Sequence, residues 1–231
     1  MTYTAKNIKA ILFDMDGTLV DSESLTGFAL LALLADRSLP SGDLDLVQFH
    51  GITWLSIAQR LGTLFPDLAD QERHLASEIE DRFQLLFEST PPELIPGARQ
   101  AFAAAAASFP QNTTIVTSSE ARAVEVLLDH ADLRALCTGY TSCDQYKKSK
   151  PDPQSYLMAA ARLGVNPTTC LVFEDSQPGL LAARAAGMHC VAITRRVAVR
   201  IQLAEELADG SIDDYHNLPE GFFTAAAGAE A

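Results

Sequence analysis

Two carboxylates, Asp14 and Asp16, stand two residues apart directly after a short apolar run of this 231-residue sequence. If that run is a strand of a parallel sheet, both side chains leave its carboxyl end, where such sheets bind ligands. Gly17 follows and lets the chain turn sharply. Carboxylates this close repel each other and need a cation between them, and hard oxygen ligands favour Mg²⁺. The alternative is an acidic loop that only caps the strand.

A second pair of carboxylates, Glu174 and Asp175, follows another apolar run in the same way. The next residues, from Ser176, are typical of a helix start, so these acids could instead only stabilise the helix N-terminus through its dipole. The carboxyl ends of parallel strands meet at one edge of their sheet. We therefore expect both pairs of carboxylates at a single site.

Hydroxyl and ammonium groups that suit a phosphate lie in two further segments. Thr117 and Ser118 follow a third apolar run and are suited to holding phosphate oxygens, with an ordinary helix N-cap as the alternative. Lys150 lies before Pro151 in a segment that contains three of the five lysines, where a solvated basic turn is the alternative. In a chain of formal net charge -13, a rigidly held lysine supplies the local positive charge that a phosphate requires.

The apolar runs that precede these residues predict strands buried on both faces, because each run is short, continuous and bounded by turn residues. Helical patterns separate the later runs. Strands that alternate with helices predict an α/β fold in which helices cover a parallel sheet. The expected strands are residues 10–13, 114–116, 170–173 and 190–193.

Residues 22–89 interrupt this alternation, since they contain helical patterns and no strand-like run. Prolines in residues 89–97 break the last of these helices and indicate a linker back to the sheet. We predict a core domain of residues 1–21 and 90–231, and an inserted all-helical domain of residues 22–89.

Composition and charge narrow the class of protein. Hydrophobic residues make up 48% and charged residues 20% of the chain, as in a globular protein. The acidic balance repels nucleic-acid backbones and anionic membranes, so we expect neither as a partner. No apolar segment approaches the length of a membrane span, and the apolar stretch near the N-terminus is too short for a signal peptide. Four cysteines without metal-binding spacing suit a reducing compartment, so we expect a cytoplasmic protein.

The order of these motifs resembles the haloacid dehalogenase superfamily, in the branch that contains β-phosphoglucomutase and the phosphoglycolate and sugar phosphatases. The resemblance covers nearly the whole chain. It implies a Rossmann-like parallel sheet with a helical cap inserted just after the first motif. The motifs are Asp14-Met15-Asp16-Gly17-Thr18, the hydroxyl residue Thr117, Lys150 before Pro151, and Glu174-Asp175.

The resemblance implies a role for each of these residues. Asp14 is similar to the nucleophile that accepts the phosphoryl group, and Asp16 to the general acid and base. Thr117, Ser118 and Lys150 would contact the phosphoryl oxygens. The implied Mg²⁺ ligands are Asp14, the backbone carbonyl of Asp16, Glu174 and Asp175.

Departures from the family pattern narrow the expected activity. Dehalogenases lack the second aspartate, so Asp16 argues against dehalogenation. Phosphonoacetaldehyde hydrolases use a cap lysine, and this chain has no lysine between Lys9 and Lys147. β-Phosphoglucomutases carry a histidine and an arginine where this chain has Thr26 and Trp54.

We therefore expect a Mg²⁺-dependent phosphatase that acts on a small phosphorylated metabolite, most plausibly a sugar phosphate. His50 and Trp54 are candidates for shaping the substrate pocket, although a lone Trp on a helix is more often a packing residue. A phosphosugar mutase is the first alternative. The second is a catalytically silent protein that binds a phosphorylated metabolite, and the sequence does not indicate an oligomeric state.

Overall fold

The computed structural model describes residues 7–42, 44–49, 53–195 and 198–228. It divides into two compact units, one made of Met1–Asp21 and Glu93–Ala231 and the other of Ser22–Pro92. Each described helix is too short or too polar to cross a lipid bilayer.

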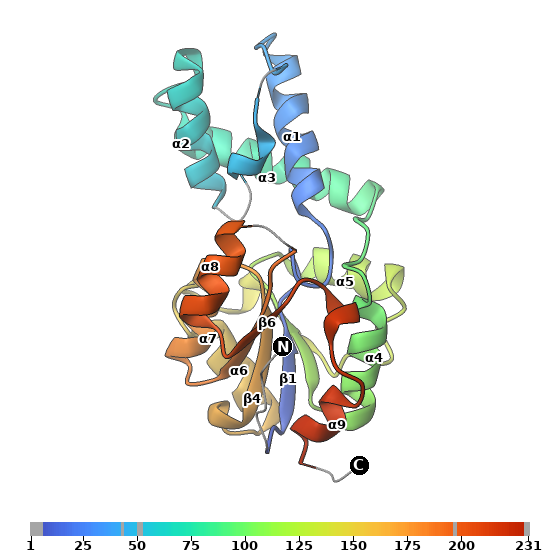
Figure 1. The fold of residues 1–231 in the computed structure, drawn as a ribbon. Helices are drawn as coiled ribbons and strands as arrows, with labels where there is room; N and C mark the ends of the chain where they lie inside the picture. Colours follow the sequence, from blue (N-terminus) through green and yellow to red (C-terminus); the bar gives the residue numbers. More distant parts are fainter. Residues whose placement is uncertain (1–6, 43, 50–52, 196–197, 229–231) are drawn as a thin grey trace. The chain divides into compact units, whose positions relative to one another are not determined.

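The larger unit is built on a six-stranded parallel sheet in the order β3-β2-β1-β4-β5-β6 (Figure 1). The chain places β2 and β3 on one side of β1 and the later strands on the other. The order therefore reverses at β1, which opens a crevice beyond the carboxyl ends of the central strands. The strands are β1 (Ala10–Phe13), β2 (Thr113–Val116), β3 (Tyr140–Thr141), β4 (Cys170–Glu174), β5 (His189–Ile193) and β6 (Gly210–Ile212).

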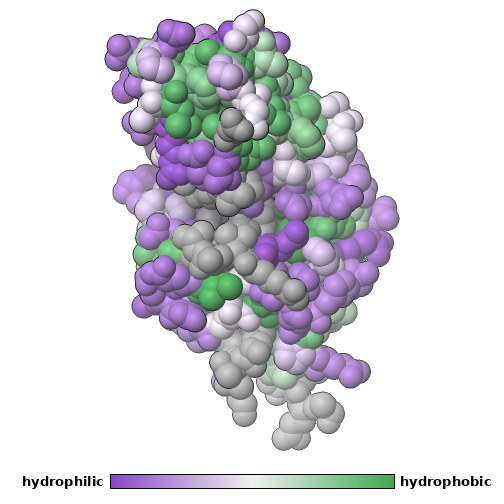
Figure 2. Space-filling model, turned by 45° about the horizontal axis from the view of Figure 1, so that its top comes forward, coloured by the Kyte–Doolittle hydropathy of each residue, from purple (hydrophilic) through white to green (hydrophobic). Residues whose placement is uncertain are grey.

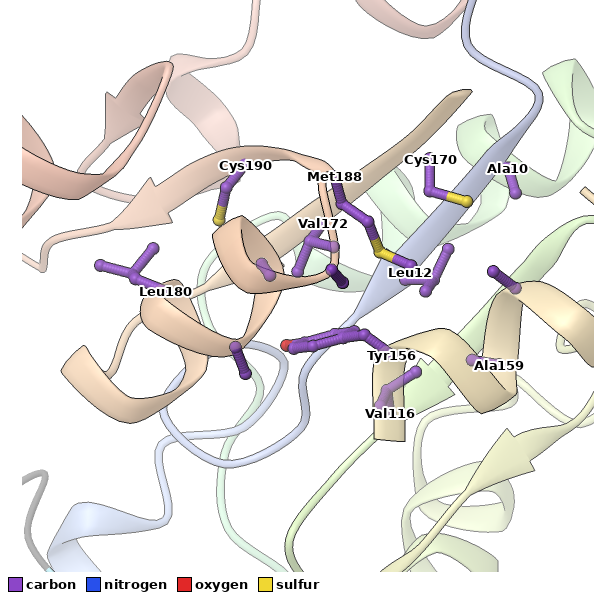
Figure 3. Packing of buried hydrophobic residues seen from close by; sticks show 14 of the residues in the cluster. Ala10, Leu12, Val116, Tyr156, Ala159, Cys170, Val172, Leu180, Met188 and Cys190 are labelled. Atoms are coloured by element: carbon purple, nitrogen blue, oxygen red, sulfur yellow. The ribbon is translucent and has the colours of Figure 1, made fainter. Parts of the chain in front are cut away.

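Alternate side chains of the central strands pack against helices on opposite faces of the sheet. On one face, Leu12 and Val172 lie in a buried cluster with Tyr156 of α6 and Leu180 of α7 (Figure 3). On the other, the Phe13 ring stacks on Phe173, with centroids 5.0 Å apart. The central strands are mainly apolar because both faces of the sheet are covered. The helices of this unit are α4 (Ala98–Ser108), α5 (Ala121–His130), α6 (Gln154–Leu163), α7 (Gln177–Ala185), α8 (Ala198–Leu207) and α9 (Phe222–Ala226).

The predicted α/β fold with a parallel, Rossmann-like sheet is confirmed, and each of the four predicted strands is present within one residue of its expected ends. The sequence prediction missed the edge strands β3 and β6. They are two and three residues long, and each carries too little apolar sequence to stand out as a buried run.

The described residues of the smaller unit form the α-helices α1 (Glu23–Asp36), α2 (Trp54–Leu64) and α3 (Glu72–Ser89), with short 3-10 helices at Leu46–Phe49 and Pro66–Leu68. Their inward faces form a separate apolar core that includes Leu33, Leu61 and Ile79. Arg82 bridges Asp36 of α1 at 2.8 Å and Glu78 of α3 at 3.1 Å, and Arg37 also pairs with Glu78. Large apolar side chains of this unit remain exposed, and Figure 2 shows apolar surface over its helices.

We predict that Glu78→Gln destabilises the protein by about 0.5–1 kcal/mol at pH 7, the range of partly exposed ion pairs. Hydrogen bonds from Arg37 lower the pKa of Glu78 from 4.5 to about 2. A lowered folded-state pKa gives stability that is present above the unfolded pKa and is lost as the pH falls through the folded value. The difference in free energy of unfolding between wild type and Glu78→Gln, measured with urea, should therefore decrease as the pH falls from 4.5 to about 2. A pH-independent difference, or an equal loss in Asp81→Asn on the exposed side of α3, would contradict this.

Candidate active site

A buried lysine joins two carboxylates at the carboxyl edge of the sheet. The ammonium of Lys150 donates hydrogen bonds to Asp14 Oδ1 and Glu174 Oε1, each at 2.7 Å, and to the Val116 carbonyl at 3.2 Å. The side chains of Lys150, Asp14 and Glu174 are only 5%, 8% and 0% exposed. Charges this deeply buried require such partners.

The electrostatics of this cluster follow from its burial and its excess of carboxylates. Burial opposes the charge on Lys150, but Asp14 and Glu174 outweigh it and raise the lysine pKa well above its ordinary value. For Asp14, burial and the neighbouring carboxylates, Glu174 first, raise the pKa well above normal despite Lys150. One lysine therefore does not offset the negative charge that converges on Asp14.

Three carboxylates are arranged to hold a cation. Asp14, Glu174 and Asp175 are all buried, and one oxygen from each lies within 4.8 Å of the others. A set made only of carboxylate oxygens fits a hard divalent cation. Such an ion would supply the positive charge that the cluster lacks, so the residues present fit a divalent metal site.

Both carboxylate oxygens of Glu174 also accept hydrogen bonds from neighbouring groups of the protein. Oε1 accepts from Lys150 and from the Tyr156 hydroxyl at 3.1 Å. Oε2 accepts from the backbone N–H groups of Asp175 and Ser176, at 2.8 and 2.9 Å, and from the Ser176 hydroxyl. Although burial opposes ionisation, Lys150 and these donors lower the pKa of Glu174. Glu174 thus anchors both Lys150 and the turn from β4 into α7.

Asp175 is positioned by the loop that follows β1. The Thr18 hydroxyl donates to Asp175 Oδ1 at 3.2 Å. Gly17 has φ of 76°, and a Cβ there would lie 2.1 Å from Asp175 Oδ2. Only glycine therefore allows both this turn and the approach of the Asp175 carboxylate.

Asp16 contacts the segment that follows β2. Its Oδ2 accepts from the Ser119 hydroxyl at 2.6 Å and from the Thr117 hydroxyl at 3.3 Å. The Tyr146 hydroxyl donates to the Thr117 carbonyl at 2.9 Å. Ser118 lies between the two Asp16 contacts and its side chain is exposed.

The structure brings together the predicted residues of the larger unit, namely Asp14, Asp16, Thr117, Ser118, Lys150, Glu174 and Asp175, at one edge of the sheet. The sequence did not indicate Tyr146 and Tyr156 as residues of the site, nor the contact of Ser119 with Asp16. Tyr156 could have been found from the sequence, because it lies six residues after Lys150 and on the buried face of the helix that follows. Its ring also lies 4.8 Å from the Lys150 ammonium.

Of the two predicted cap residues, the structure describes Trp54. His50 falls outside the described residues. Trp54 begins α2 in the smaller unit, and its ring packs on Phe83 with centroids 5.1 Å apart. This contact is a packing contact within the helical unit.

The fold and the site define an α/β enzyme that works at the carboxyl edge of a parallel sheet. The sequence matches the family model of haloacid dehalogenase-like hydrolases over residues 8–187, and the chain belongs to this family. The resemblance noted from the motifs is thereby confirmed.

Two curated relatives resemble the chain in sequence, and one solved structure resembles it in fold. It is 33% identical to the fructose-1-phosphate phosphatase YqaB of Escherichia coli (strain K12), over 78% of this chain and 94% of that one. It is 32% identical to hexitol phosphatase B of the same strain, over 82% of this chain and 85% of that one. The β-phosphoglucomutase of Clostridium difficile shares the fold, with a TM-score of 0.69, 22% identity and coverage of 96% and 97%. The chain is a phosphatase of the branch that includes these proteins.

We predict that Gly179→Ala destabilises the protein by about 2–5 kcal/mol, through overpacking and a broken buried ion pair. A Cβ at Gly179 would lie 1.6 Å from Glu174 Oε1, so Glu174 must release Lys150 or α7 must move. Gly62→Ala is the matched control, because Gly62 is also helical and its nearest neighbouring atom would be 3.5 Å away. The control should be neutral or slightly stabilising in urea unfolding. Equal stability of the two variants would contradict the proposed crowding.

Proposed function

We propose that this protein is a Mg²⁺-dependent phosphatase that hydrolyses the phosphate monoester of a small sugar or sugar alcohol through a phosphorylated Asp14. The observation that carries the proposal is the Lys150 ammonium fixed 2.7 Å from Asp14 in a buried carboxylate cluster. In a chain of net charge -13, this arrangement concentrates positive charge beside a nucleophilic oxygen.

In the first step, a carboxylate oxygen of Asp14 attacks the phosphorus atom of the substrate. The bond from phosphorus to the alcohol oxygen breaks, and Asp16 in its acid form donates its proton to that oxygen. Lys150 lies where it can neutralise charge on the transferring group, and the Thr117 and Ser118 segment is suited to receive its oxygens. The products are the free alcohol and an acyl phosphate on Asp14.

In the second step, Asp16 as a carboxylate takes a proton from water while the water oxygen attacks phosphorus. The bond from phosphorus to Asp14 breaks, which releases inorganic phosphate and restores the Asp14 carboxylate. Splitting the hydrolysis into two displacements lowers the barrier of each. Both steps return the protein to its starting protonation state.

The residues that would hold Mg²⁺ are Asp14, Asp175, the backbone carbonyl of Asp16 and, within the same cluster, Glu174. When bound, the ion supplies positive charge against the nucleophile and the phosphoryl oxygens. Lys150 holds Asp14 and Glu174 together through its hydrogen bonds to both carboxylates.

The substrate class is proposed from the named relatives, which are phosphatases of fructose 1-phosphate and of hexitol phosphates. A phosphosugar mutase is less well supported. Such an enzyme must hold a second phosphate with a cap cation, and Trp54 offers one neutral donor in place of an arginine fork. We further propose a cytoplasmic location, in keeping with four free thiols and an acidic chain.

We predict that phosphate release requires Mg²⁺, is abolished by EDTA, and is restored by Mg²⁺ but not by Ca²⁺. Calcium takes more ligands at longer distances, so it would shift Asp14 from the position needed for attack. Phosphate release in EDTA, with and without each ion added back, is the measurement. Full activity in EDTA or with calcium would contradict the metal assignment.

We predict phosphate release from at least one compound in a panel of fructose 1-phosphate, sorbitol 6-phosphate, mannitol 1-phosphate, phosphoglycolate and glucose 6-phosphate. Asp14→Asn should abolish it, because an amide is a poor nucleophile. In a parallel coupled assay, β-glucose 1-phosphate with a trace of its 1,6-bisphosphate should give no appreciable glucose 6-phosphate. Isomer formation that outpaces phosphate release would favour the mutase. Binding of a panel compound without turnover would favour a catalytically silent protein.

A further inference from the structure

The segment after β2 holds Asp16 through a small hydrogen-bond network. The Ser119 hydroxyl donates to Asp16 Oδ2 at 2.6 Å, and the Thr117 hydroxyl donates to the same oxygen at 3.3 Å. The Ser119 backbone N–H donates to Thr117 Oγ1 at 2.9 Å. Ser119 therefore supports Asp16 twice, once directly and once by orienting Thr117.

The Ser119 contact is the stronger of the two. A distance of 2.6 Å is within the usual range for a hydroxyl that donates to a carboxyl oxygen, whereas 3.3 Å is beyond that range. The contact also joins residues 103 positions apart in the sequence, so only the folded sheet creates it.

The Ser119 hydroxyl does not cap the following helix, α5. The N-cap residue of α5 is Glu120, with no side-chain capping bond. The Ser119 carbonyl accepts from the Cys143 backbone N–H at 3.1 Å, which fixes the backbone on which the hydroxyl stands. Ser119 is thus held from the adjoining loop while its side chain points to Asp16.

We propose that Ser119 is a positioning residue that orients the Asp16 carboxyl for proton transfer to the leaving oxygen. This inference rests on the proposed function, in which Asp16 acts as the general acid. A general acid must lie within hydrogen-bond reach of the oxygen that it protonates. An aspartate side chain has several accessible rotamers, and a second contact from a fixed backbone selects one of them.

Substrates with different leaving groups test whether Ser119 acts through proton donation by Asp16 or affects the site as a whole. An alkoxide leaves poorly without a proton, so hydrolysis of a sugar phosphate depends on a correctly placed acid. p-Nitrophenolate is stable as an anion and leaves without one. Moreover, kcat/KM covers only the steps up to release of the alcohol, so it reports proton donation separately from the later attack by water.

The experiment compares kcat/KM of wild type, Ser119→Ala, Ser119→Thr and Ser211→Ala on two substrates. One is the panel compound that wild type hydrolyses fastest, and the other is p-nitrophenyl phosphate. Ser119→Ala should lower kcat/KM about 10- to 100-fold on the former and less than about threefold on the latter, because a general acid contributes on the order of 100-fold or more. Ser119→Thr should recover most of the loss. Ser211, exposed on the edge strand β6, is the matched serine control and should be silent.

Two results separate failure of this inference from failure of the proposed function. Equal losses on both substrates, or no loss on either, would overturn the role of Ser119 while leaving the phosphatase proposal in place. Wild-type protein that releases phosphate from neither substrate would overturn the phosphatase proposal, and with it the role of Ser119. Circular dichroism of each variant confirms folding, and Ser119→Thr serves as the informative variant if Ser119→Ala does not fold.

Discussion

The rest of the site depends on the buried Lys150 ammonium shared between Asp14 and Glu174. An unpaired charge at this depth would cost several kcal/mol, so the three groups stabilise one another only as a set. Glu174 in turn is fixed by Tyr156 and by the backbone at the start of α7. Asp14 is therefore tied to three different strands through the single Lys150 ammonium, and its position follows from the register of the sheet.

The second constraint on the site is that the backbone of two loops lies very close to carboxylate oxygens. Gly17 and Gly179 both lie against carboxylate oxygens of the β4 end, where any side chain would collide. These two glycines let the loops after β1 and β4 converge until three carboxylates share one small volume. Burial, followed by the neighbouring carboxylates, raises the pKa of Asp14, and the three carboxylates together suit a divalent cation.

The helical unit is a separate structure with its own apolar core and its own ion pairs. Trp54 contributes to that core through Phe83. Asp16, by contrast, accepts hydrogen bonds from Thr117 and Ser119 within the larger unit. The larger unit therefore contains every described residue to which we assign a part in phosphoryl transfer.

The sequence by itself determined the parallel sheet, because strands covered on both faces are read directly as continuous apolar runs. It also predicted that the two pairs of carboxylates meet, since residues that follow such runs lie at one edge of the sheet. It indicated Lys150 through the place of this lysine before Pro151 in an acidic chain. It did not show the edge strands β3 and β6, which are too short to carry a pattern. Only the tertiary structure decided that Glu174 anchors Lys150, that Tyr156 supports both, and that Ser119 contacts Asp16. These contacts join residues far apart in the chain, and their partners depend on register and rotamer, which no local pattern encodes.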